Sequence, residues 1–173
     1  MASPQPKFLY LPKNQWSSRF EGSFYTVRVD GFQRFDKTPE EGSSSSSNTK
    51  TNSSTVLTNG KIGGHSHHPA FYYKVVLNRS QTSREMWRRF SQFQWLYHQV
   101  KKNPPPPPDA NAAEHQPEEP LHLPLGTCWP FQSEQLGEKR VELLNSFLDD
   151  MLSRPGYASH RAVVTFLELD ETL

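Results

Sequence analysis

The chain has 173 residues, the length of one domain, and its net charge of +1 provides no overall positive field to attract nucleic acid. Its single cysteine, Cys128, excludes an internal disulfide and a cysteine-rich zinc site. The hydrophobic fraction of 34% is low for a folded chain of this size, which indicates that part of the length is not packed.

The N-terminal part is predicted to hold one strand between two irregular segments. Residues 1–20 are mixed in composition and contain prolines, and we interpret them as a tail. In residues 23–30 apolar side chains alternate with polar ones, as in a strand with one buried face. Residues 37–69 then lose all pattern, so we expect a low-complexity, disordered insertion that does not pack.

Two more strands are predicted after the insertion, at 70–78 and at about 84–90. A polar turn from Arg79 to Ser83 joins them, and short connections of this kind join antiparallel strands. The three strands therefore form an antiparallel meander if the insertion is looped out.

Helical patterns follow the strands. In residues 91–102 apolar side chains recur at the i, i+3, i+4 and i+7 spacing of a helix. Consecutive prolines end this helix and open a long irregular loop at 103–132. Ser133 is a suitable N-cap for a helix to about Arg154, and a short helix at about 158–169 completes the chain. Strands that precede helices indicate an α+β domain.

The most informative stretch lies where the third strand meets the first helix. There Arg88 and Arg89 are followed at once by Phe90. A guanidinium can fork onto phosphate oxygens, and a flat ring can cover the apolar face of a sugar. The stretch therefore indicates a site for a phosphorylated sugar ring, although a solvated strand end is the simpler alternative from these residues alone.

In their order, the elements resemble the phox-homology (PX) domain, a phosphoinositide-binding module. The resemblance covers about 21 to 170. It rests on the Arg-Arg-aromatic-Ser-x-Phe-x-x-Leu motif at 88–96, the prolines at 104–108, and the helical segment 138–148. It implies a single domain over 21–173. The fold would be a three-stranded antiparallel β-meander followed by about three helices, with a proline-rich loop between the first and second helices.

The resemblance also implies roles for individual residues. Arg89 is similar to the arginine that grips the 3-phosphate, and Phe90 takes the place of the aromatic residue, usually Tyr, that stacks on the inositol ring. Arg140 resembles the helix arginine that binds the 4- and 5-hydroxyls, although a solvated position in a Glu-Lys-Arg run is the alternative. Arg88 is expected to be a supporting charge.

One departure from the family pattern concerns the 1-phosphate. The family usually places a lysine after the proline-rich loop, but this chain has no Lys or Arg between Lys102 and Lys139. Thr127 stands roughly where that lysine is expected. His122 can replace the lysine only in part, because an imidazole is mostly uncharged near neutral pH. Losing one charge-assisted phosphate contact costs on the order of 1.5–3 kcal/mol, so we expect weak lipid affinity or a vestigial site.

Apolar side chains crowd the loop after the prolines, and in the family this loop dips into the bilayer. Trp and Phe suit the membrane interface, where an apolar body meets a wet edge. The alternative is that these side chains cap the domain's own core, and we expect the loop to divide between the two roles. The residues assigned to membrane insertion are Leu123, Leu125, Trp129 and Phe131.

Two further patterns have weaker support. Lys101, Pro104 and Pro107 match a basic-x-x-Pro-x-x-Pro ligand of Src-homology-3 domains, although the same prolines belong to the family's own loop. His65, His67 and His68 lie in a Gly- and Ser-rich segment without nearby Cys or carboxylate, so we predict no metal site.

The sequence shows no catalytic constellation and implies no cofactor. It also has no run of about 18 apolar residues that would predict a membrane span. We therefore predict a non-enzymatic, cytoplasmic, peripheral membrane-targeting domain, with phosphatidylinositol 3-phosphate on endosomal or vacuolar membranes as its target. The competing hypothesis is a protein-interaction adaptor that keeps the fold with a weakened or lost lipid site and acts through its proline-rich loop or helices.

Overall fold

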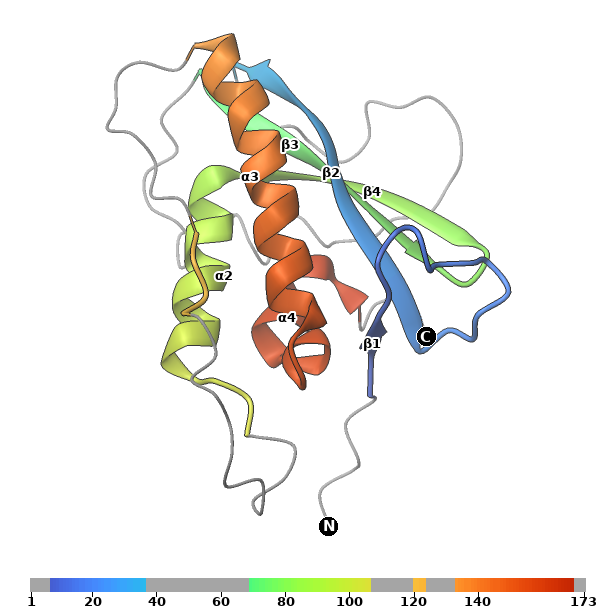
Figure 1. Ribbon diagram of the computed structural model, residues 1–173. Helices are drawn as coiled ribbons and strands as arrows, with labels where there is room; N and C mark the ends of the chain where they lie inside the picture. The colour runs from blue at the N-terminus through green and yellow to red at the C-terminus, as the bar shows by residue number, and fades with distance from the viewer. Residues whose placement is uncertain (1–6, 37–68, 107–119, 124–132, 170–173) are drawn as a thin grey trace.

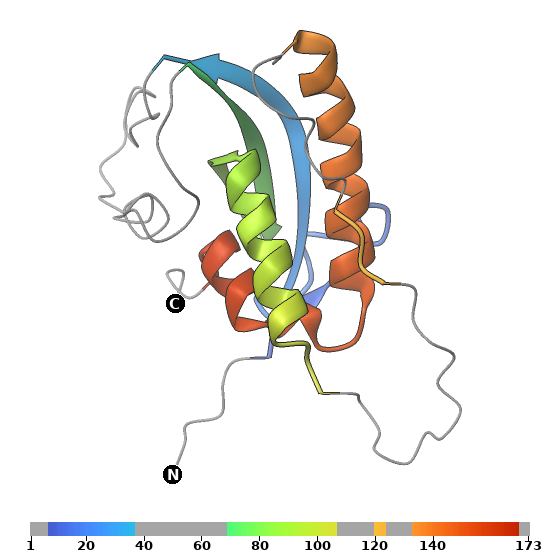
Figure 2. The same cartoon turned by 90° about the vertical axis from the view of Figure 1, so that its left-hand side faces the viewer.

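A computed structural model of the protein describes residues 7–36, 69–106, 120–123 and 133–169. Within these residues the chain forms a sheet with the strand order β1-β2-β3-β4, followed by helices that cover one face of it (Figures 1 and 2). The elements are β1 (Leu9–Tyr10), β2 (Phe24–Phe35), β3 (Ala70–Arg79), β4 (Thr82–Arg89), α2 (Phe90–Lys102), α3 (Glu134–Ser153), the 3-10 turn η1 (Tyr157–Ser159) and α4 (Arg161–Leu167).

The predicted α+β fold is confirmed. Strands β2, β3 and β4 pair antiparallel in sequence order, and the helical part follows them. Most of the predicted insertion, residues 37–68, lies outside the described residues, as does most of the long loop after the prolines. Among the residues that the structure describes, no helix is both long enough and apolar enough to cross a membrane.

The N-terminal tail predicted for residues 1–20 is wrong from Phe8 onward. Leu9 and Tyr10 form β1, which pairs parallel with β2, and Phe8 is only 3% exposed. The Tyr10 hydroxyl donates a hydrogen bond to Asp149 on α3, which ties the strand to the helical layer. A strand of two residues is too short to produce a period in the sequence, and for this reason the pattern did not reveal it.

Strand β2 is longer than predicted because a bulge interrupts its alternation. Val29 pairs with Val75 and Gly31 with Lys74, so Asp30 is the extra residue of the bulge. One extra residue exchanges the two faces of everything that follows. As a result Phe32 lies on the helix-covered face, where its ring packs edge-on against Phe71 at 5.1 Å between centroids.

At the bulge, α3 is also hydrogen-bonded to the sheet. The Asn145 side chain accepts a hydrogen bond from the Val29 N–H and donates one to the Val29 carbonyl, both at 2.8 Å. An amide side chain thus satisfies both backbone groups at the point where the ladder is interrupted. Figure 1 shows the consequence, with α3 lying along β2.

Three arginines of the β3–β4 hairpin bind the C-terminal end of α4. Arg79, Arg84 and Arg88 donate to the backbone carbonyls of Leu169, Glu168 and Phe166, at 3.0, 3.2 and 3.0 Å respectively. Cations satisfy the last carbonyls of a helix and complement its dipole. Arg84 and Arg88 also form ion pairs with the Glu168 carboxylate, whose side chain is 5% exposed.

We expect Arg88→Met to lower the free energy of unfolding by about 3 kcal/mol, because Glu168 loses one of its two cations inside the protein. Urea unfolding followed by circular dichroism measures the loss. Arg28→Met is the matched control, since Arg28 and its partner Asp30 are 36% and 42% exposed, and it should cost less than about 1 kcal/mol. Equal stability of the two variants would contradict the role given to Arg88.

Stability should fall at alkaline pH. Burial raises the pKa of Tyr25, Tyr10 and Tyr73 above the ordinary tyrosine value of 10.0, and a hydrogen bond to Asp149 adds to the rise for Tyr10. The unfolded chain therefore releases these protons near pH 10 while the folded chain retains them, so the free energy of unfolding decreases as the pH rises above 10. Urea unfolding at pH 8 and pH 11 measures the decrease, which should be smaller in Tyr25→Phe. A decrease of the same size in that variant would exclude Tyr25 as a contributor.

Candidate functional site

The two adjacent arginines at the end of β4 point in opposite directions, because successive side chains of a strand alternate between faces. Arg88 pairs with Tyr73 and lies on the face that the helices cover. Arg89 pairs with Tyr72, and its guanidinium lies 5.6 Å from the centroid of that ring on the other face. The two arginines therefore cannot have the same role.

The interpretation of Arg88 as a supporting charge for the ligand is wrong. The residue is 3% exposed, and two of its guanidinium nitrogens donate to the Phe166 carbonyl at 3.0 and 3.2 Å. The same group forms an ion pair with Glu168. A third guanidinium nitrogen donates to the Trp87 carbonyl, so the donors of Arg88 are used inside the protein and the residue does not face a headgroup.

Arg89 is the N-cap of α2, in an extended conformation. Its backbone N–H donates to the Gln92 side chain at 2.8 Å, and Gln92 is nearly buried, which fixes the residue at the helix start. The first turn of α2 contains no acidic residue. The positive end of the helix dipole and a guanidinium therefore occur together, an arrangement that favours an anion.

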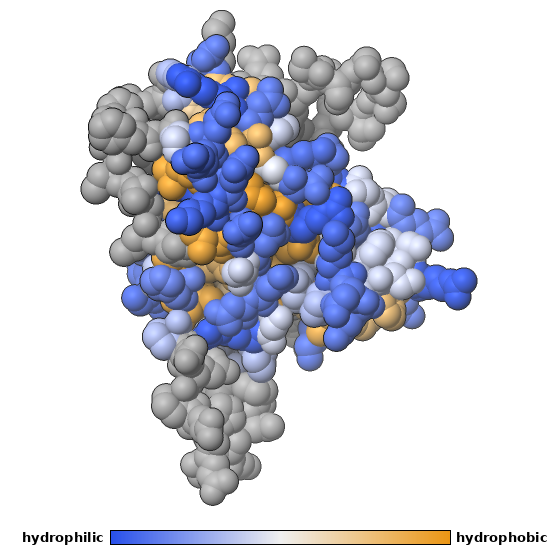
Figure 3. Space-filling model, turned by 45° about the horizontal axis from the view of Figure 1, so that its top comes forward, coloured by the Kyte–Doolittle hydropathy of each residue, from blue (hydrophilic) through white to orange (hydrophobic). Residues whose placement is uncertain are grey.

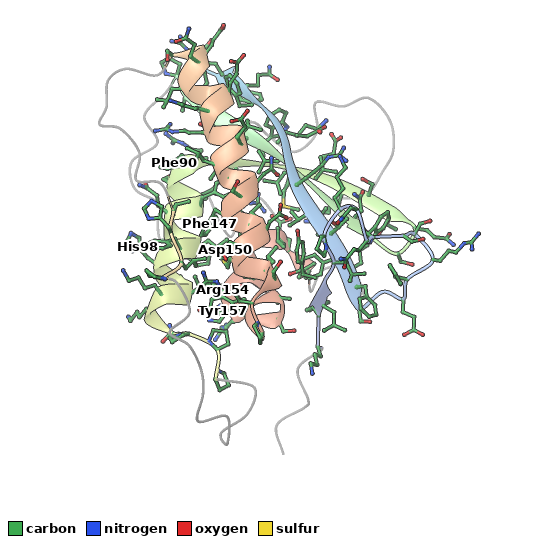
Figure 4. All side chains as sticks on the ribbon, viewed as in Figure 1. Phe90, His98, Phe147, Asp150, Arg154 and Tyr157 are labelled. Carbon is green, nitrogen blue, oxygen red and sulfur yellow. The ribbon has the colours of Figure 1, made fainter. Side chains whose placement is uncertain are left out.

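Phe90 and Arg140 meet across the helical layer. Phe90 is the first residue of α2, and the guanidinium of Arg140, from α3, lies 4.3 Å from the centre of its ring. This distance is that of a cation–π contact. Figure 4 shows Phe90 at the N-terminal end of α2, well above Asp150 and Arg154 at the other end of α3. The contact brings together two distant parts of the chain that the sequence assigned to one site.

Tyr73 forms the inner wall beside Arg140. Its side chain is fully buried, and its ring packs edge-on against Phe93 at 6.2 Å. Burial raises the pKa of its hydroxyl, and the adjacent Arg140 guanidinium partly offsets that rise. Arg140 is itself only 9% exposed. A solvated surface position for Arg140, the alternative considered from sequence, is therefore excluded.

The structure thus brings two of the predicted site residues, Phe90 and Arg140, into contact, while the Arg89 guanidinium lies over the Tyr72 ring on the other face of the sheet. Arg89 precedes Phe90 in the chain, and Arg140 covers Phe90 through space. A guanidinium can bind phosphate oxygens through paired hydrogen bonds, and an aromatic ring can pack on the apolar face of a sugar. The arrangement is suited to an anionic headgroup built on a ring.

The described prolines lie away from this ring. The proline segment follows the C-terminal end of α2, ~20 Å along the helix from Phe90 (Figure 1). Pro105 packs against Gly156, whose φ of +83° is a left-handed conformation in which a side chain would meet the proline. The Asn103 carbonyl is hydrogen-bonded by the His160 ring at 2.7 Å. These contacts favour a structural role for the prolines.

Lys101 and Pro104, two residues of the predicted Src-homology-3 ligand, are exposed, and Lys101 lies 5.5 Å from the centre of the Tyr97 ring. Pro107 lies outside the described residues. The protein-interaction assignment of these three residues stays a prediction.

The assignment of Leu123 to membrane insertion is wrong, because this side chain is 1% exposed and belongs to the hydrophobic core. His122, beside it, is exposed. The other assigned residues, Leu125, Trp129 and Phe131, lie outside the described residues, as does Thr127.

Figure 3 turns the top of the molecule forward and shows apolar atoms near the middle of a largely hydrophilic described surface.

Sequence reasoning missed three residues that shape the site. Tyr73 has no signal of its own in a strand rich in aromatic and β-branched side chains. Gln92 stands three positions after the N-cap, where Gln and Glu commonly bind back to the cap, and that spacing is a usable signal. Gly137 is a glycine inside a predicted helix, which indicates a special packing requirement.

Comparison with known proteins identifies the family and the fold of the chain. The family model of the PX domain matches residues 76–170, which is more than half of the chain. The X-ray structure of a designed CISK-PX domain is similar in fold, with a TM-score of 0.50 and 20% sequence identity over 81% of this chain and 95% of that chain. No curated protein sequence matches significantly. The chain belongs to the PX-domain family of phosphoinositide-binding, membrane-targeting modules.

Proposed function

We propose that this domain binds phosphatidylinositol 3-phosphate and brings its chain to the cytoplasmic face of endosomal or vacuolar membranes. Arg89 binds the 3-phosphate at the N-terminal end of α2. Phe90 packs on the inositol ring, and Arg140 donates to the ring hydroxyls. The domain binds and recruits and carries out no chemical step.

The observation that carries the proposal is the contact between Arg140 and Phe90, at 4.3 Å. The Phe90 ring is already paired with the Arg140 guanidinium, which places an apolar surface beside a charged donor, and the residue before it is a second arginine at a helix N-terminus. Binding then needs little rearrangement of the site, and preorganisation of this kind lowers the entropic cost of association.

The number of cations supports a headgroup with a single ring phosphate. Arg88 is committed to Glu168, so we assign the headgroup contacts to two other arginines: Arg140, which contacts Phe90, and Arg89, which precedes Phe90 in the chain. The sequence from 103 to 138 adds no Lys or Arg. A headgroup with two or three ring phosphates would place more negative charge at the site than two guanidiniums neutralise.

Arg89→Ala should weaken binding to vesicles that contain phosphatidylinositol 3-phosphate by roughly ten- to a hundredfold. The variant removes a charge-assisted contact worth about 1.5–3 kcal/mol, and each 1.4 kcal/mol is about tenfold in affinity. Vesicle co-sedimentation measures the loss. The panel includes vesicles with phosphatidylinositol 4-phosphate, phosphatidylinositol 4,5-bisphosphate or phosphatidylserine in its place.

Arg28→Ala is the matched control, because it removes an arginine of the same sheet that pairs with Asp30 near the surface. It should bind like the wild type. Equal binding by a folded Arg89→Ala variant would remove Arg89 from the site. A wild-type chain that binds none of these vesicles would favour the adaptor with a lost lipid site.

The apolar loop residues outside the described ranges extend the proposal. Leu123 fills the core, so we assign the membrane contact to Leu125, Trp129 and Phe131. Wild-type tryptophan fluorescence should shift to the blue on vesicles, and Trp129→Ala should lack this shift and bind less tightly, because an aromatic ring partitions into the interface. Salt should not screen this apolar component of binding.

The core-packing alternative for Trp129 makes the opposite prediction. There Trp129→Ala lowers the free energy of unfolding by about 3–5 kcal/mol, as for a buried aromatic side chain, and leaves vesicle affinity per folded molecule unchanged. Thermal melting and vesicle partitioning of this one variant separate the two. A stability loss without a partitioning loss would end the insertion proposal.

A further inference from the structure

Gly137 occupies the first turns of α3, where a glycine is unfavourable for the helix by itself. The residue is buried against Phe32 of β2. A methyl group built on Gly137 would lie 2.7 Å or less from three carbon atoms of the Phe32 ring. Real side-chain contacts are not this short, so the helix can lie this close to the sheet only because residue 137 has no side chain.

The Phe32 ring is partly buried, and two neighbouring rings limit its movement away from α3. The bulge at Asp30 sends it to the helix-covered face, where it contacts the Phe71 ring at 5.1 Å and the Tyr73 ring at 6.3 Å between centroids. Tyr73 is fully buried. Displacing the Phe32 ring therefore also disturbs Tyr73, the buried residue adjacent to Arg140.

Arg140 follows Gly137 by three residues, so the two lie on the same face of α3, one turn apart. Any outward shift of this turn carries the Arg140 guanidinium away from Phe90, which it now contacts at 4.3 Å. The distance between α3 and the sheet at Gly137 thus sets the position of the Arg140 guanidinium relative to Phe90.

We propose that Gly137 is a positioning residue for the headgroup site: its lack of a side chain lets α3 seat on Phe32 and thereby places Arg140 over Phe90. This inference rests on the proposed function for its effect on lipid binding. Its structural half, the dependence of Arg140 on Gly137, can be measured without any lipid.

The test compares Gly137→Ala with the double variant Gly137→Ala/Phe32→Leu, in which a smaller side chain gives the methyl group room. The matched control is Gln135→Ala, an exposed position in the same part of α3. The lipid-free readout is the nuclear magnetic resonance shift of the Arg140 side-chain protons, which the Phe90 ring current displaces. The second readout is affinity for vesicles containing phosphatidylinositol 3-phosphate, per folded molecule.

Gly137→Ala should move the Arg140 resonances toward their values in an unstructured peptide and lower vesicle affinity about tenfold, the smaller end of the effect of losing a charged hydrogen bond. The double variant should restore both, and Gln135→Ala should change neither. This rescue separates positioning from a general loss of structure, because a merely destabilised helix would not regain the Arg140 shift when a second core side chain is made smaller.

Unchanged Arg140 resonances in a folded Gly137→Ala variant would overturn the inference. If Gly137→Ala does not fold, the double variant decides, and a folded double variant with displaced Arg140 resonances would also overturn it. A wild-type chain that shows the ring-current shift but binds no phosphoinositide vesicle would instead overturn the proposed function and leave the positioning of Arg140 intact.

Discussion

The ion pair between Arg88 and Glu168 is the interaction on which the rest of the structure depends. Both side chains are about 95% buried, so each would be costly inside the protein without the other. Hydrogen bonds from Arg88 to the Phe166 carbonyl fix the end of α4 against β4, and a third nitrogen of the guanidinium donates to the Trp87 carbonyl. Because neighbouring strand residues face opposite ways, the inward commitment of Arg88 also directs Arg89 outward at the start of α2.

The sequence indicated which residues belong to the candidate site, but it did not show which of the two adjacent arginines would be buried. The family resemblance assigned Phe90 and Arg140 to one site, and the structure brings their side chains into contact. The burial of Arg88 could not be predicted, because its partner Glu168 is captured where α4 ends in a left-handed turn, with φ of 53°. That geometry depends on helix packing and leaves no local pattern in the sequence.

The elements missed or shortened in the prediction share a cause: each lacks a repeating pattern. Strand β1 has two residues, and the second half of β2 follows a bulge that reverses the alternation used to recognise it. Leu123 stands in an irregular loop, where no periodicity distinguishes a core side chain from a membrane-facing one. Long-range packing decides in each case, and the sequence provides only the composition.

The bulge in β2 affects the candidate binding site through the packing of α3. It turns Phe32 toward the helices, where only a glycine at 137 lets α3 approach, and this approach sets the position of Arg140. With a net charge of +1 and exposed acids such as Glu138 and Glu142 on α3, long-range attraction to an anionic membrane is small. Affinity must then come from close contacts, and hydrogen bonds weaken steeply with poor geometry. A site with few charges therefore depends strongly on the packing that places them.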